Sequence, residues 1–204
     1  MREPGRPVAV ACPGLIRGGR VLYATNLGWP DDADPAQELG VNVSLVENDA
    51  VAAALGESVL RAGNASLPDL IYISLGTGVG SAYVADGVAG DLDLGHRYVG
   101  GDIYCTGCRN VGCLNAHLCS QRLPAALTAA DQAYIARTLA FALEDMSVDE
   151  RTLLVLGGGI ARRYPAIASI LDSLAPNPTE LTLVPVEAKS AAYAGLDYLS
   201  HRIG

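Results

Sequence analysis

The chain has 204 residues, of which half are apolar, and a formal net charge of -8. This size and composition can bury the core of one domain or of two small ones. The acidic balance argues against nucleic acid or an anionic membrane as a partner, because both are bound through basic patches. No stretch is apolar enough to span a bilayer and no signal peptide opens the chain, so we expect a soluble protein of the cytoplasm.

The first third of the sequence predicts short strands followed by a helix. Apolar and β-branched runs indicate strands at residues 8–12, 20–24 and 41–46, with a helical turn within 31–39. Residues 50–61 are rich in alanine and leucine, so we expect a helix that begins at Asn48 or Asp49, whose side chains suit an N-cap. An acidic residue between a strand and a helix is a common active-site arrangement.

The rest of the sequence predicts a hairpin and then alternating helices and strands. Residues 70–75 and 81–84 indicate the strands of a β-hairpin whose tip, residues 76–80, is rich in glycine. The looser segment just before it is a candidate boundary, so we expect one lobe over residues 1–65 and a second over 66–204. Further helices are expected at 129–146, 164–174 and 188–200, and strands at 152–156 and 181–186.

Asp49 is the candidate catalytic base. It follows an apolar strand, and partial burial there would raise its pKa toward the working range of a general base. The alternative is that Asp49 only caps the helix, a contact worth about 1 kcal/mol. Spacing alone does not separate the two interpretations.

Two glycine clusters are candidate phosphate sites. Gly76-Thr77-Gly78 can present backbone N–H groups and a hydroxyl to an anion, although a tight hairpin turn explains the glycines equally well. Gly157-Gly158-Gly159 lies between a predicted strand and a predicted helix, where a nucleotide can approach the backbone. This second cluster has neither the spacing of a P-loop nor that of the dinucleotide-binding fingerprint.

One histidine and three cysteines in a short glycine-rich segment form the strongest chemical signal. They are His96, Cys105, Cys108 and Cys113. Nitrogen and sulfur ligands of this number suit a tetrahedral zinc ion, and four protein ligands leave no position for water, so the zinc would be structural. The alternative is a set of unrelated reduced cysteines. The remaining cysteines are expected to be free thiols: Cys12 and Cys119.

Taken in order, these motifs resemble the ROK family of bacterial sugar kinases and sugar-responsive repressors. The matching segments are Cys12-Pro13-Gly14, Asn26-Leu27-Gly28-Trp29, Glu47-Asn48-Asp49-Ala50 with Ala53-Ala54-Leu55-Gly56-Glu57, Gly76-Thr77-Gly78-Val79-Gly80, Gly95-His96, Gly112-Cys113-Leu114 and Leu156-Gly157-Gly158-Gly159. Several are generic alone, and their order makes them specific. The resemblance implies an α/β protein with the actin-like, ribonuclease-H-like ATPase fold, in which two lobes, here with a shortened N-terminal lobe, bind sugar and ATP between them.

The resemblance also implies roles for individual residues. Asp49 would take the proton from a sugar hydroxyl that attacks the γ-phosphate of ATP bound with magnesium, and His96 would both touch the sugar and ligate zinc. Other sugar contacts would come from Gly14, Asn48, Asp93 and Asn115. Phosphate and adenosine contacts would come from Gly76, Thr77, Gly78, Gly157, Gly158 and Gly159.

The chain departs from the family pattern in three places. The Asp-x-Gly-Gly-Thr phosphate loop that opens family members has no counterpart in residues 1–12. Two glutamates with which the family holds sugar are replaced by Asp93 and Asn115, and the first two cysteines are spaced Cys-x-x-Cys rather than Cys-x-Cys. We therefore expect a kinase for a hexose or an N-acetylated hexosamine, with a catalytically inactive sugar-binding protein or a truncated remnant as alternatives. A homodimer would fit the family.

Overall fold

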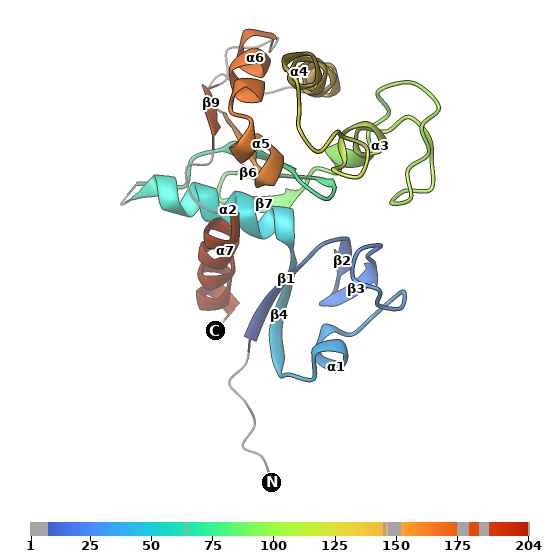
Figure 1. Ribbon diagram of the computed structural model, residues 1–204. Coiled ribbons are helices and arrows are strands. Elements are labelled where there is room, and N and C mark those ends of the chain that lie inside the picture. The colour runs from blue at the N-terminus through green and yellow to red at the C-terminus, as the bar shows by residue number, and fades with distance from the viewer. Residues whose placement is uncertain are drawn as a thin grey trace.

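A mixed β-sheet forms the centre of the larger part of the molecule (Figure 1). The structure is a computed structural model and describes residues 8–63, 65–144, 146, 152–174, 180–183 and 188–203. Within these residues the sheet has five strands in the order β7-β6-β5-β8-β9. They are β5 (Leu70–Leu75), β6 (Val79–Ala85), β7 (Val88–Asp91), β8 (Leu153–Gly157) and β9 (Glu180–Leu183). Neighbours among β5, β6 and β7 are antiparallel, whereas β5, β8 and β9 run parallel.

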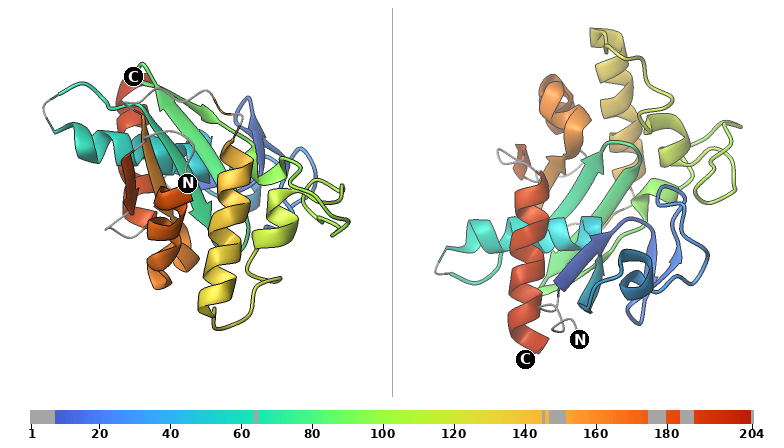
Figure 2. Two further views of the ribbon diagram at one scale, coloured as in Figure 1. Left: turned by 90° about the horizontal axis from the view of Figure 1, so that it is seen from above. Right: turned by 60° about the horizontal axis from the view of Figure 1, so that its bottom comes forward.

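Helices cover both faces of this sheet (Figures 1 and 2). They are α2 (Asp49–Ala62), α3 (Leu114–Leu118), α4 (Ala129–Leu143), α5 (Gly158–Arg163), α6 (Ala166–Leu174) and α7 (Ala188–Ile203), with a 3-10 turn η1 (Leu94–His96). Successive side chains of β5 alternate between the two faces. Leu70 and Tyr72 pack against α2, whereas Ile71, Ile73 and Leu75 pack in the larger core with α3, α4 and α6. The sheet is therefore buried on both sides.

The N-terminal residues form a smaller β-structure beside this sheet (Figure 1). Its elements are β1 (Val8–Cys12), β2 (Leu15–Arg17), β3 (Arg20–Tyr23), α1 (Pro35–Leu39) and β4 (Val43–Asn48). β1 pairs in parallel with β4, and β2 pairs with β3 as a hairpin. A small core of Cys12, Val21 and Ala33 stabilises this part. β4 leads directly into α2, so Asp49 lies at the junction of the two parts.

Two glycines let α2 and α7 pack backbone against backbone. A Cβ added at Gly56 would collide with the carbonyl of Ala191, and a Cβ added at Gly195 would collide with the carbonyl of Ala52. α7 also contacts β1, so the C-terminal helix touches both parts of the molecule. Elements on either side of the expected lobe boundary near residue 65 therefore pack against each other. The division of the chain into lobes at this residue stays a prediction.

Replacing Gly56 by alanine should lower the free energy of unfolding by about 1 to 3 kcal/mol, the usual cost of overpacking a core. Glycine to alanine in a helix ordinarily stabilises by up to about 1 kcal/mol, so the sign of the change reports the close contact. Gly159→Ala is the matched control, because no heavy atom lies within 4 Å of a Cβ at that helical glycine. Urea unfolding of both variants measures the difference, and a stabilised Gly56→Ala variant would contradict the close packing.

The α/β class, the hairpin over residues 70–84 and the helix that begins at Asp49 are confirmed. The helix expected over 129–146 ends at Leu143. Five short elements were not expected, namely β2, β7, η1, α3 and α5, because elements of three to six residues carry too little periodicity. Part of the strand expected over 181–186 lies outside the described residues. None of the described helices is long and apolar enough to cross a membrane.

Candidate functional site

Asp49 lies where β4 ends and α2 begins. The cap of this helix is Asn48, whose Oδ1 accepts hydrogen bonds from the backbone N–H groups of Ala50 at 2.8 Å and Val51 at 3.2 Å. The interpretation of Asp49 as the cap is therefore wrong. The Asp49 carboxylate lies in the first turn of the helix, where it accepts a hydrogen bond from the N–H of Ala50 at 2.9 Å.

Asn48 also connects α2 to the turn between β1 and β2. Its Nδ2 donates to the carbonyl of Gly14 at 2.8 Å. Gly14 has a φ of 102°, and a Cβ at this position would collide with the carbonyl of Tyr23. Only glycine fits such a turn, so the turn lies at a fixed place beside the start of α2.

Four carboxyl groups share the region around Asp49. Burial raises the pKa of the Asp49 carboxyl, and the charge of Asp91 raises it further, although the N–H of Ala50 acts in the opposite direction. Burial and then Asp91 also raise the pKa values of Glu47 and Asp93. Asp49 is nevertheless exposed to solvent, so a ligand can reach its carboxylate. A carboxylate in this setting can accept a proton from a ligand more readily than an ordinary aspartate.

Asp93 joins this acidic region to His96. Its φ is 50°, and its N–H donates to Asp91 Oδ1 at 2.9 Å, so the chain bends just before η1. The proximity of His96 acts in the opposite direction to burial and lowers the pKa of the Asp93 carboxyl. The sequence alone indicated no functional role for Asp91 or Glu47. The Asp-x-Asp spacing before Gly95-His96 was a signal that could have indicated Asp91. The proximity of Asp91 to Asp49 arises only because β7 lies beside α2 in the fold.

The four candidate zinc ligands come together between η1 and α3. They are His96, Cys105, Cys108 and Cys113, and one ligand atom from each lies within 4.8 Å of all the others. The Sγ atoms of Cys108 and Cys113 are 3.8 Å apart. The Nδ1 of His96 is 3.9 Å from the Sγ atoms of Cys105 and Cys113. Tetrahedral zinc with bonds of about 2.3 Å requires sulfur atoms about 3.8 Å apart, so the donor set and its spacing fit a closed zinc site.

The surroundings of Cys105 favour a thiolate, the form that binds metal. Burial by itself would raise the pKa of this thiol, but hydrogen bonds from the Cys108 N–H, the Asn115 amide, Cys113 and the Gly107 N–H lower it to about 6. All five cysteines, including Cys12 and Cys119, are unpaired in the structure.

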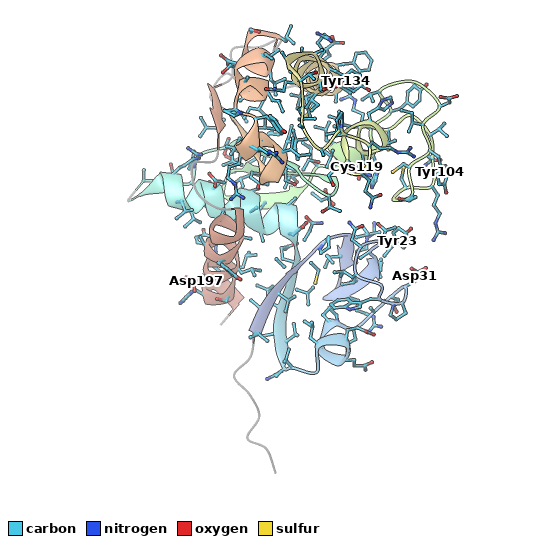
Figure 3. The ribbon with its side chains drawn as sticks, in the orientation of Figure 1. Tyr23, Asp31, Tyr104, Cys119, Tyr134 and Asp197 are labelled. Atoms are coloured by element: carbon cyan, nitrogen blue, oxygen red, sulfur yellow. The ribbon has the colours of Figure 1, made fainter. Side chains whose placement is uncertain are left out.

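The metal loop, which we define as residues 105–113, also contacts the N-terminal β-structure. The Tyr23 hydroxyl donates to the Thr106 carbonyl at 3.3 Å, and the Arg109 guanidinium lies 5.1 Å from the centre of the Tyr23 ring. Figure 3 shows Tyr23 facing the loop that carries Tyr104. No motif in the sequence indicated this contact, because it joins residues 83 positions apart.

The two glycine clusters lie at the same edge of the central sheet. β5 and β8 are parallel neighbours with Ser74 opposite Gly157, so their carboxyl ends meet. This is the edge at which α/β sheets bind ligands. A Cβ at Gly158 would collide with the backbone of Leu75, so close packing alone accounts for that glycine. A Cβ at Gly76 would meet nothing within 4 Å, so this position is open to a ligand.

The β5–β6 hairpin ends in a closed turn, and its second strand contacts the start of α2. The N–H of Gly76 donates to the carbonyl of Gly78 at 3.0 Å, which places Thr77 at the apex of a closed turn. A Cβ at Gly80 would lie 3.2 Å from that of Ala50, the residue that follows the candidate base. The first residues of β6 and the start of α2 therefore pack against each other.

Asn115 lies between the hairpin and the metal loop. Its Oδ1 accepts a hydrogen bond from the N–H of Val79 at 2.9 Å, and its Nδ2 lies 3.4 Å from the Sγ of Cys105. Both ends of the amide therefore contact protein groups. The structure places Asn115 beside the other candidates, and its role toward sugar stays a prediction.

Comparison with known proteins matches residues 2–177 to the ROK family. A glucokinase of Halalkalibacterium halodurans is 36% identical over 121 residues, which make up 52% of this chain and 36% of the glucokinase. A xylose repressor of Caldicellulosiruptor bescii is 33% identical over 118 residues, or 52% of this chain and 29% of the repressor. The matched region thus spans about a third of the length of each curated relative.

A solved structure shows the same fold. A ROK family glucokinase from Streptomyces griseus, in complex with glucose and AMPPNP, matches with a TM-score of 0.77 and 20% sequence identity over 94% of this chain and 80% of that one. The fold is therefore the actin-like ATPase fold that the sequence resemblance implies. Because the family match covers well over half of the chain, the protein belongs to the ROK family.

Proposed function

We propose that this chain carries the active site of an ATP-dependent sugar kinase that phosphorylates a hexose or an N-acetylated hexosamine. One observation supports this most directly: a carboxylate with a raised pKa begins the helix that packs on β6 and β7, the strands between the glycine hairpin and the acidic region that leads to His96. The glucokinase relative and the glucose-bound structural neighbour support sugar and ATP as the ligands.

In this proposal Asp49 is the general base. Its carboxylate accepts the proton of a sugar hydroxyl as the hydroxyl oxygen attacks the γ-phosphorus of ATP, a new oxygen–phosphorus bond forms, and the bond to the departing ADP oxygen breaks. Magnesium bound with ATP supplies charge neutralisation. The backbone N–H groups of Thr77 and Gly78 hold phosphate, with the open position at Gly76 giving the phosphate access to the turn, and Gly157–Gly159 lie beside the adenosine.

The sugar contacts we propose are Gly14, Asn48, Asp93, His96 and Asn115. Zinc would shape this part of the site without entering the reaction, because four protein ligands close its coordination. The Nδ1 of His96 faces the cysteine sulfur atoms, so Nε2 is the ring nitrogen left for a sugar hydroxyl. We further propose that residues 1–65 and 66–204 form two lobes that hold sugar and ATP between them.

A sugar-binding protein without turnover is the second candidate. The xylose repressor relative favours it, as does the replacement of two sugar-binding glutamates of the family by Asp93 and Asn115. Asp93 is one methylene shorter than glutamate and Asn115 is uncharged. The shorter side chain of Asp93 reaches less far toward the sugar, and the amide of Asn115 forms weaker hydrogen bonds with sugar hydroxyls because charge-assisted bonds are the stronger ones.

A coupled ATPase assay over a panel of hexoses and hexosamines, with calorimetry on the same sugars, separates the candidates. We expect sugar-dependent turnover with at least one member of the panel. Heat of sugar binding without turnover would overturn kinase activity in favour of the sugar-binding candidate. Absence of both would overturn both candidates.

A further inference from the structure

The short helix α3 connects the metal loop to the glycine hairpin. Cys113, one of the four clustered ligands, immediately precedes α3 as its N-cap residue. At the other end of the helix, the N–H of Ser120 donates to the carbonyl of Gly76 at 3.0 Å. One turn of helix therefore separates a candidate zinc ligand from the tip of the candidate phosphate hairpin.

Asn115 makes the most direct contact between the metal loop and the glycine hairpin. Its Oδ1 accepts from the N–H of Val79, at the start of β6, at 2.9 Å. Because a backbone N–H can only donate, the oxygen of the amide must face Val79, and the NH2 group must face the sulfur of Cys105, 3.4 Å away. A Cβ at Gly78 would lie 2.9 Å from Asn115 Oδ1, so the amide also packs tightly against the hairpin tip.

An amide is the group that this position requires. It offers an acceptor toward the hairpin and a donor toward the thiolate of a zinc ligand. A carboxylate, as in the glutamate of the family pattern, keeps the acceptor but has no donor, and it would place negative charge beside a negatively charged sulfur. The replacement by Asn115 therefore creates a connection that a glutamate cannot make in this geometry.

We propose that Asn115 is a positioning residue that couples the metal loop to the hairpin, so that zinc binding orders residues 76–80 and thereby strengthens binding of the phosphoryl donor. Asn115 exerts this coupling through Val79 and Cys105, and its remaining amide hydrogen and lone pair stay available for the sugar contact proposed above. The coupling between the metal loop and the hairpin does not depend on the proposed function. The effect on binding of the phosphoryl donor rests on the proposed function.

Asn115→Asp is the informative variant, because it keeps the acceptor for Val79 and replaces the donor that faces Cys105. Zinc affinity measured by competition with a chromogenic chelator should fall about 10- to 100-fold, as is typical when a group that supports a metal ligand is lost. Asn110→Asp is the matched control. It adds the same charge to the metal loop, but its amide donates to the carbonyl of Cys108 at 3.3 Å rather than to a sulfur. An equal loss of zinc affinity in both variants would overturn the proposal.

Hydrogen exchange of the peptide that contains residues 76–80 tests the coupling without any nucleotide. Zinc should slow this exchange at least about tenfold in the wild-type protein and much less in Asn115→Asp, because coupled sites influence each other reciprocally. Asn115→Gln keeps both the donor and the acceptor and should restore part of the effect. If Asn115→Asp fails to fold, wild-type exchange that does not respond to zinc still refutes the coupling.

Calorimetry with ATP and magnesium on zinc-loaded and zinc-free protein tests the effect of zinc on binding of the phosphoryl donor. The wild type should bind ATP several-fold more tightly with zinc, and Asn115→Asp should lose this difference. If neither form binds ATP while zinc still protects residues 76–80, the proposed function fails and the coupling survives. ATP binding that is independent of zinc in the wild type would overturn the proposed effect on the donor.

Discussion

Replacing Asp49 by asparagine is expected to lower sugar-dependent ATP turnover by about a hundred- to ten-thousand-fold, the range that a positioned general base contributes. Asparagine keeps the size of the side chain and still accepts a hydrogen bond from the N–H of Ala50, but it cannot take a proton. Binding of sugar should therefore persist. Steady-state kinetics together with calorimetry measure the two effects separately.

Asp172→Asn is the matched control for this variant. Asp172 lies exposed in α6, on the opposite face of the central sheet from Asp49, and its neutralisation changes the net charge by the same amount. Turnover should remain at the wild-type level in the control. Unchanged turnover in Asp49→Asn would remove Asp49 as the base, and loss of sugar binding would indicate a structural effect instead.

The raised pKa of Asp49 also determines the sign of two pH effects. Turnover should fall as the pH decreases through this raised pKa, because the ionised carboxylate is the active form. A raised pKa in the folded state means that the group stabilises the fold at low pH and that this contribution is lost as the pH rises through the folded value. Asp49→Asn should therefore melt slightly higher than the wild type at about pH 8, and the difference should shrink at about pH 3. Thermal melts at both pH values check this expectation.

Purified protein is expected to contain about one zinc ion per chain, and Cys108→Ser should weaken zinc binding by more than about a hundredfold. Loss of a group that only supports a ligand costs 10- to 100-fold, so loss of a ligand itself should cost more. Apparent zinc affinities of about 10–16 kcal/mol are comparable to the stability of a whole domain, so the metal loop should become sensitive to protease after chelation. Elemental analysis and limited proteolysis measure these effects.

Cys119→Ser controls for the loss of a thiol. Cys119 is also a half-buried free cysteine, but it lies outside the cluster of four ligands. This variant should retain the full metal content. Full metal content in Cys108→Ser would refute the proposed ligand set, and zinc-free wild-type protein that does not take up added zinc would refute the site altogether.

Local features were the ones that sequence reasoning predicted correctly. The start of α2, the β5–β6 hairpin and the ROK resemblance all depend on residues close together in the chain, and the structure or the comparisons confirm them. The structure also brings the four candidate zinc ligands together, and zinc itself stays a prediction. Residue spacing and side-chain chemistry are enough to predict these local features, because few backbone conformations are compatible with a given spacing of residue types.

Contacts between distant segments could not be predicted in this way. The carboxyl of Asp91 affects the pKa of Asp49 only because β7 and α2 pack side by side, and Tyr23 meets the metal loop across 83 positions. The assignment of the helix cap to Asn48 rather than Asp49 depended on the actual direction of each side chain.

The sequence by itself thus determined the family, the candidate base and the candidate metal ligands, because each is a matter of residue type and short spacing. Only the tertiary structure decided that the two glycine clusters share one sheet edge and that Asn115 joins the hairpin to the metal loop. The physical reason is that hydrogen bonds and burial act over a few ångströms. Segments far apart in the chain meet at that distance only after the sheet and its helices have packed.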